Sequence, residues 1–377
     1  MPLNNEVTSE KARQYQAAKR RLFLVRMGLT VLFLLAWLLT GASHSLKVWL
    51  LGYQENFFFL VALYFACFAV VSFFFSLPLD IFEEFFLERR FGLSRQSWRA
   101  WSGDVLKSGL LAFVVSLISI EGVYFFLSQF PSFWWLWAAF FWFFLSIVMA
   151  RIFPRLVLPL FFKVKPLEEG DLRQRLFTLF GRFRVRLKEI MVLDFSKKTV
   201  KANAMVSGLG STKQIFLADT LLENFAPAEI EAVLAHELGH YLRHDTAKLV
   251  FTSLASALFS FAAAHLIFSA FLPVFGFAAA SDVAALPLLL LILFGAGLLL
   301  LPLQNGFSRR LERRADAFAL EATASPDAFI SMMRRLGERN LADFQPPRWV
   351  EFFFYDHPPI GKRIAMARRF IHAGENI

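Results

Sequence analysis

The stretch Ala235-His236-Glu237-Leu238-Gly239-His240 decides how the rest of this sequence is interpreted. Residues four apart lie on one face of a helix, so the imidazoles of His236 and His240 can bind one ion. Glu237 is rotated by about 100° and can act on a water molecule that the ion activates. The pattern is typical of catalytic zinc sites, which keep one coordination position open. The alternative is a helix with two structural histidines.

The composition is that of a membrane protein. Of the 377 residues, 57% are hydrophobic, 17% are aromatic and only 19% are charged, and the mean hydropathy is +0.51. Such values are far from those of soluble domains. The net charge of +10 comes from basic clusters beside apolar stretches, which is the pattern of membrane topology. We therefore expect no nucleic-acid partner.

Six stretches are long and apolar enough to cross a bilayer, each near the ~20 residues that a span needs. They are residues 22-41, 57-79, 107-127, 133-153, 247-272 and 284-306. Lys and Arg are concentrated before the first span, between the second and third, and after the fourth. By the positive-inside rule, both termini and the zinc motif face the cytoplasm.

The spans divide the chain into five parts. We expect a cytoplasmic N-terminal segment (1-21), a four-span region (22-153), a first part of the zinc domain (154-246), a two-span region (247-306) and a second part of the zinc domain (307-377). The two parts of the zinc domain must pack together, because each carries only part of a folded unit. The sequence thus predicts a mainly α-helical membrane bundle with a cytoplasmic α+β zinc domain.

Within 154-246, the pattern predicts a helix near 172-186, and then short strands at 190-193 and 214-218 around a glycine turn. Pro227 is suited to the start of the zinc helix. No proline follows until Pro273, so we expect this helix to run straight into the fifth span.

A third protein ligand is needed for zinc, and two candidates stand out. His244 continues the four-residue spacing, but it is about 12 Å from His236 along a helix, too far for one ion. Glu312 lies about 8 Å past the end of the sixth span and so at a depth similar to that of His240. Asp316, one turn further, suits a carboxylate that orients a ligating histidine. The alternative for Glu312 is an ion pair with neighbouring arginines.

Several motifs together resemble the integral-membrane CAAX prenyl protease 1 family of zinc metalloproteases. They are His236 to His240, Ser308-Arg309-Arg310 leading to Glu312 and Asp316, Leu77-Pro78-Leu79 leading to Phe91-Gly92, Asn203-Ala204, Phe216 to Leu222, and His357-Pro358-Pro359 followed by Arg363. The resemblance covers most of the chain. The smaller heat-shock membrane metalloproteases are the second resemblance, since they share the zinc motif but lack the long N-terminal half and the His-Pro-Pro signature.

The resemblance implies further roles. Transmembrane helices would enclose a large chamber, which the zinc domain caps on the cytoplasmic side. His357 and Arg363 would contact the substrate near the metal. Asn203 would lie on an edge strand that receives the substrate as an added strand. Turn-forming roles are the alternatives for His357 and Asn203.

The sequence also departs from the family. Met205 replaces the usual tyrosine after Asn-Ala, which puts side-chain specificity at that strand in question. Eukaryotic members have seven spans, and the first has no counterpart here, so the closure of the chamber is open. The compact zinc domain favours a bacterial source and the inner membrane, with the endoplasmic reticulum membrane as the alternative.

We therefore expect a monomeric zinc endopeptidase with one Zn²⁺ per chain, held by His236, His240 and Glu312, with Glu237 as general base. Its substrate would be a membrane-associated polypeptide, lipidated or not, and its surroundings membrane lipid. The alternatives are a quality-control protease without prenyl specificity, and a transporter or scaffold with structural zinc. Within the spans, Glu121 and His265 would either line a hydrated chamber or form interhelical hydrogen bonds.

Overall fold

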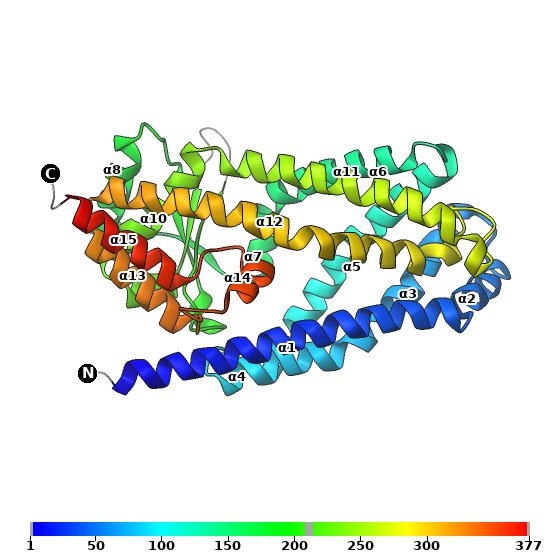
Figure 1. The fold of residues 1–377 in the computed structure, drawn as a ribbon, viewed down its shortest axis with the longest axis horizontal. Coiled ribbons are helices and arrows are strands. Elements are labelled where there is room, and N and C mark those ends of the chain that lie inside the picture. The colour runs from blue at the N-terminus through cyan, green and yellow to red at the C-terminus, as the bar shows by residue number, and fades with distance from the viewer. Residues whose placement is uncertain (1–2, 208–213, 375–377) are drawn as a thin grey trace.

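Long helices form most of the molecule, and a smaller mixed domain lies at one end of their bundle (Figure 1). The computed structural model describes residues 3–207 and 214–374. Six helices in this part of the chain are long and apolar enough to cross a membrane: Glu10–Leu39, Phe57–Arg90, Trp98–Gln129, Trp134–Phe161, Asp245–Phe271 and Val283–Thr323. The mainly helical membrane fold and the number of candidate spans are confirmed for the described residues.

The elements follow in this order. The helices are α1 (Leu3–Leu39), α2 (Ala42–Leu51), α3 (Phe57–Asp80), α4 (Glu88–Arg90), α5 (Trp98–Gln129), α6 (Trp134–Ile152), α7 (Leu158–Phe161), α8 (Asp171–Arg182), α9 (Asp219–Asn224), α10 (Pro227–Leu242), α11 (Asp245–Phe271), α12 (Leu286–Thr323), α13 (Pro326–Arg339), α14 (Arg348–Phe354) and α15 (Ile360–Gly374). The strands are β1 (Val164–Pro166), β2 (Glu189–Leu193), β3 (Ala204–Ser207) and β4 (Gln214–Ala218). Two π-helical turns, Ile81–Leu87 and Phe153–Val157, interrupt the second and fourth spans.

The membrane half is held together by apolar and aromatic packing and by a few internal hydrogen bonds. One buried cluster joins α1, α2, α3, α5, α6, α11 and α12. His265 of α11 accepts a hydrogen bond from Trp134 Nε1 of α6 at 3.0 Å, so an interhelical bond satisfies this histidine. Residues of α1, α3, α5 and α12 line an open, mainly apolar pocket of about 900 Å³, in which phenylalanine is the commonest lining residue.

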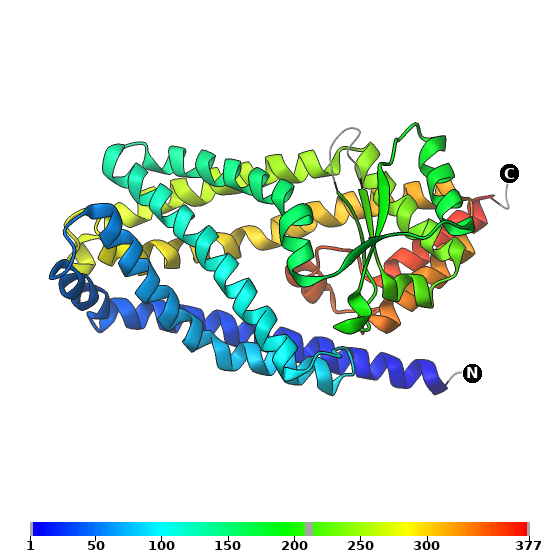
Figure 2. The same ribbon diagram turned by 180° about the vertical axis from the view of Figure 1, so that it is seen from behind.

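The four strands form one sheet in the order β1-β2-β4-β3, seen from behind in Figure 2. The expected strands at 190-193 and 214-218 exist, but they are parallel neighbours, with Ile190 paired to Ile215. The expectation that the two strands lie around a glycine turn is therefore wrong, since a tight turn joins only antiparallel strands. The antiparallel partner of β4 is β3. The glycine turn itself lies outside the described residues.

The small domain has a core of its own, to which both cytoplasmic parts of the sequence contribute. Buried side chains of α8, β2, β4 and α10 pack there with those of α12, α13 and α15. Pro227 begins α10 as predicted, and Glu229 accepts the backbone N–H of Ala226 at 2.7 Å, which satisfies one of the free donors at this helix start.

The expectation that α10 continues straight into the fifth span is wrong. The helix α10 ends at Leu242, and α11 begins at Asp245. Between them His244 adopts a left-handed conformation, with φ of 54°. This conformation ends a helix even without proline or glycine. The chain therefore changes direction just before it enters the membrane.

Candidate active site

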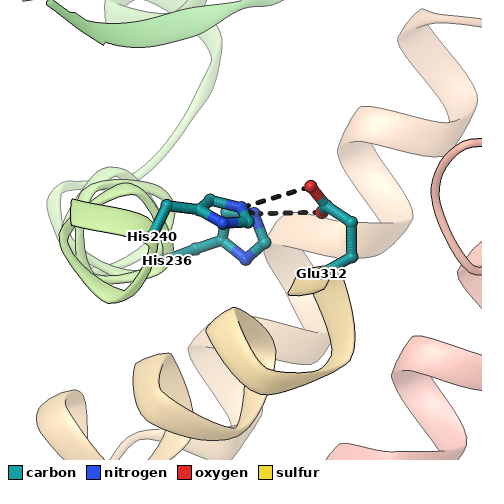
Figure 3. Close-up of side chains that lie close together, drawn as sticks. All are labelled: His236, His240 and Glu312. Carbon is teal, nitrogen blue, oxygen red and sulfur yellow. Dashed lines mark hydrogen bonds and ion pairs between the residues drawn. The ribbon is translucent and has the colours of Figure 1, made fainter. Parts of the chain in front are cut away.

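Two antiparallel helices bring together the three residues that the sequence predicted as metal ligands (Figure 3). His236 and His240 come from α10, and Glu312 comes from the part of α12 beyond the membrane. The Nε2 atoms of the histidines are 3.1 Å apart. Glu312 Oε2 lies 3.3 Å from His236 Nε2, and Oε1 lies 3.2 Å from His240 Nε2. His244 is not part of this group, which accords with the distance argument.

The cluster has the features of a metal site. One ligand atom from each of His236, His240 and Glu312 lies within 4.8 Å of the others. Glu312 Oε2 is buried and accepts no well-aligned hydrogen bond, and such an orphaned atom is costly unless a cation binds it. Two imidazoles and one carboxylate form the donor set of open catalytic zinc sites. The residues present thus fit a metal ion.

Asp316 fixes the orientation of His236 from behind. Its Oδ1 lies 2.9 Å from His236 Nδ1, which directs Nε2 toward the shared point. Burial alone would lower the pKa of His236, but the neighbouring carboxylates of Asp316 and Glu312 outweigh this effect and raise the pKa to about 9. A metal ion that binds here competes with a proton for the His236 imidazole.

Arg363 of α15 binds the other side of Asp316. Its Nε donates to Asp316 Oδ2 at 2.8 Å, and its Nη2 donates to Oδ1. The same Nη2 lies 4.0 Å from Glu312 Oε2, so the guanidinium borders the metal-binding cluster. Asp316 is fully buried, and an arginine is the partner that satisfies such a carboxylate best.

Asp245 orients His240 as Asp316 orients His236, and this residue was not predicted from the sequence. Its Oδ2 lies 3.0 Å from His240 Nδ1, and only 1% of the residue is exposed. Each ligating histidine thus has one carboxylate on Nδ1 and leaves Nε2 for the metal. No sequence signal would have found Asp245 while α10 was taken to run straight through His244.

Two further predicted residues lie around the cluster. Glu237 is on α10, where burial raises the pKa of its carboxyl, although the positive charges of His236 and His240 oppose that shift. His357 lies in the turn between α14 and α15, and its Nε2 is 3.3 Å from Glu312 Oε1. Its Nδ1 is 2.8 Å from Asp356 Oδ1. Half of the His357 side chain is exposed, so it can meet a substrate.

Asn203 directly precedes β3, which is an edge strand of the sheet. Its carbonyl accepts the N–H of Ala218 at 3.0 Å, which extends the ladder between β3 and β4 by one residue. The side chain of Asn203 is exposed. Among the described residues, no strand lies along the other edge of β3.

A bundle of membrane helices with a His-His-Glu cluster at one end defines the class of protein as a membrane-embedded metallopeptidase. Residues 3–163 match the family model described as CAAX prenyl protease N-terminal, five membrane helices. Residues 166–371 match the model of peptidase family M48. The chain belongs to peptidase family M48, which confirms the resemblance found in the sequence.

The relatives extend over most of the chain. It is 27% identical to the uncharacterized metalloprotease YhfN of Bacillus subtilis over 97% of this chain and 86% of that protein. It is 30% identical to the CAAX prenyl protease 1 homolog of Arabidopsis thaliana over 77% of this chain and 69% of that protein. The crystal structure of S. mikatae Ste24p shares the fold, with a TM-score of 0.85 at 23% identity over 96% of this chain and 89% of that one.

Proposed function

We propose that the chain is a zinc-dependent endopeptidase that cleaves membrane-associated polypeptides, lipidated ones included, at the cluster of His236, His240 and Glu312. The observation that carries this proposal is the orphaned, buried Glu312 Oε2 facing two imidazoles whose Nδ1 atoms are already engaged. Such a set holds one metal ion firmly and leaves a position for chemistry. One Zn²⁺ bound there would polarise the scissile carbonyl and lower the pKa of a water molecule.

The residues around the cluster transfer protons, bind the oxyanion, contact the substrate and orient the histidines. Glu237 takes a proton from the attacking water and gives it to the leaving amine, and its raised pKa suits a group that must both accept and donate. His357 donates a hydrogen bond to the carbonyl oxygen of the scissile bond, which becomes an oxyanion when the water attacks the carbonyl carbon. Arg363 keeps Asp316 charged and, at the border of the cluster, contacts the substrate. Asp316 and Asp245 hold the two imidazoles in place.

The substrate backbone would lie along β3. An edge strand can bind an extended peptide through backbone hydrogen bonds, which requires no strict sequence preference. Asn203, exposed at the start of β3, would add a side-chain hydrogen bond. The structure puts Met205 at this strand, where it pairs with Phe216 of β4.

The membrane half of the protein has an apolar pocket that could hold the lipid group of a lipidated polypeptide. The pocket of about 900 Å³ is walled by Phe33, Phe65, Phe68 and other aromatic side chains, and its size fits an isoprenoid or acyl chain. The distribution of Lys and Arg supports a cytoplasmic position for both termini and for the metal-bearing domain. We place the protein in a bacterial inner membrane, as a monomer in contact with membrane lipid.

The test is metal content and cleavage measured together on detergent-purified wild type, Glu237→Gln and Glu312→Ala. The peptides are a farnesylated peptide and its unmodified twin. We expect wild type to cleave, Glu237→Gln to keep about one zinc per chain while losing at least a hundredfold in kcat, and Glu312→Ala to lose the metal. A Glu237→Gln protein that still cleaves would sink the mechanism.

The pair of peptides separates the substrate hypotheses. Preference for the farnesylated peptide supports a protease for lipidated chains. Equal cleavage of both peptides favours a quality-control protease. If wild type and both variants retain zinc and none cleaves, the ligand assignment is wrong and a transporter or scaffold with structural zinc becomes the better hypothesis.

A further inference from the structure

A second pocket lies against α12, where this helix leaves the apolar zone. Its volume is about 420 Å³. We call it the arginine pocket. Its lining includes the apolar side chains of Leu303 and Phe352 and the basic side chains of Arg309, Arg310 and Arg313.

The face of α12 that carries this pocket changes from apolar to basic. Leu299 and Leu303 are 72% and 66% exposed, as expected of side chains that contact lipid. Arg310 follows Leu303 by seven residues on the same face, so it lies about 10 Å farther along the helix toward the metal-bearing domain. This rise carries the helix from the edge of the hydrocarbon zone to the depth of lipid headgroups.

Two of the three arginines that line the pocket have no acidic partner among the described residues. Arg310 and Arg313 are exposed, and neither forms an ion pair with an acidic side chain in the described part of the chain. Arg309 is engaged with backbone carbonyls of α14. Two guanidinium groups without carboxylate partners, side by side on one helix face, offer the planar donors that bind phosphate best.

The short helix α14 supplies an apolar wall beside these charges. The helix α14 lies at the end of the metal-bearing domain that is nearest the membrane helices (Figure 1). Three of its aromatic side chains are exposed there: Trp349 by 58%, Phe352 by 49% and Phe353 by 46%. Exposed aromatic side chains at this depth are typical of segments that lie in the membrane interface. Phe352 belongs to both features, since it is on α14 and lines the arginine pocket.

We propose that the arginine pocket binds an anionic phospholipid from the leaflet next to the metal-bearing domain. Arg310 and Arg313 bind its phosphate, while Leu303 and Phe352 contact the first part of its acyl chains. Basic pockets at the ends of membrane helices bind acidic headgroups, and each basic residue contributes on the order of a fivefold gain in affinity. The bound lipid lies against α14, the element that precedes His357.

The test is equilibrium binding of phosphatidylglycerol, labelled on its acyl chain, to the full-length protein in non-ionic detergent. Wild type should bind it saturably, and unlabelled phosphatidylglycerol should compete far better than phosphatidylcholine or inorganic phosphate. Arg310→Gln/Arg313→Gln should weaken binding about 25-fold. Both side chains are exposed, so this variant should fold and keep its metal content.

A matched control removes the same charge elsewhere. Arg334 and Arg368 are exposed and line neither the arginine pocket nor the pocket of about 900 Å³. Arg334→Gln/Arg368→Gln should bind phosphatidylglycerol as wild type does. The proposal is overturned if the two double variants bind equally well, or if phosphatidylcholine or inorganic phosphate competes as well as phosphatidylglycerol. The readout is binding, so it is independent of proteolysis.

Discussion

Asp245 Oδ2 lies 3.0 Å from Nδ1 of His240 because the helix breaks between them. In a continuous helix a residue five positions on is rotated by about 140° and would point away from the histidine. The left-handed conformation of His244 instead starts α11 with Asp245 turned back toward the metal-binding cluster. The break therefore supplies a buried carboxylate for the second histidine.

We expect Asp245→Asn to weaken metal binding by about 10- to 100-fold, because the amide no longer fixes the charge and orientation of the His240 ring. Competition with a chromophoric chelator measures this affinity. Lys248→Met is the control, since Lys248 Nζ is the other partner of Asp245, at 2.8 Å, and its loss leaves the carboxylate in place. Wild-type metal affinity in Asp245→Asn would show that Asp245 is only structural.

The same break shows where sequence reasoning stops. His236, His240 and Glu312 could be predicted because helical spacing and depth past the membrane boundary are local properties. Asp245 could not, since no proline or glycine marks a turn at His244. Nor could the sheet order be predicted, because β2 and β4 each look like a strand, but their parallel pairing depends on contacts distant in the sequence.

Gly239 sets the distance between the two helices that carry the ligands. A Cβ added there would lie 3.2 Å from Ala315 Cα and 3.3 Å from its carbonyl oxygen. These are backbone atoms of α12, one turn from Glu312, so the helix must move to admit a methyl group. We expect Gly239→Ala to lower the unfolding free energy by about 1–3 kcal/mol and to weaken metal binding.

Thermal unfolding and chelator competition check this prediction. The control is Gly181→Ala on α8, where nothing lies within 4 Å of an added Cβ. There alanine should be neutral or stabilising by up to about 1 kcal/mol, because it favours helix more than glycine does. Equal effects of both substitutions on metal affinity would contradict the close-approach argument.

Asp316 holds two partners, His236 and Arg363, and its charge matters to both. Asp316→Asn leaves Arg363 buried without its carboxylate, so we expect a loss of about 3–5 kcal/mol in stability and weaker metal binding through His236. Calorimetry in detergent measures the first effect. The double variant Asp316→Asn/Arg363→Met should recover stability, because it removes the uncompensated charge. Failure to recover would mean that Arg363 is not the source of the loss.

The peptidase activity of the double variant Asp316→Asn/Arg363→Met tests the roles of these two residues independently of stability. The double variant should remain inactive even where its stability returns, because His236 still lacks the carboxylate on Nδ1 and the substrate lacks Arg363. A recovered kcat alongside recovered stability would contradict the proposed role of Arg363 in substrate contact.

Arg309 positions the element that carries His357. Its Nη1 donates to the carbonyl of Glu351 at 2.8 Å and to that of Tyr355, so it satisfies carbonyls at the end of α14. Asn305, one turn earlier on α12, donates to the carbonyl of Phe353 at 2.7 Å. His357 follows two residues after Tyr355, and its distance from Glu312 is thus fixed by α12 itself.

Arg309→Gln should therefore retain the metal but lose about 10- to 100-fold in kcat, since a small displacement of an oxyanion donor has an effect of this size. The Michaelis constant should change little if β3 provides most of the substrate affinity. Arg314→Gln, an exposed substitution on the same helix, is the control and should match wild type. Lost metal in Arg309→Gln would point to a general disturbance of α12, whereas an unchanged kcat would show that α14 needs no such support to place His357.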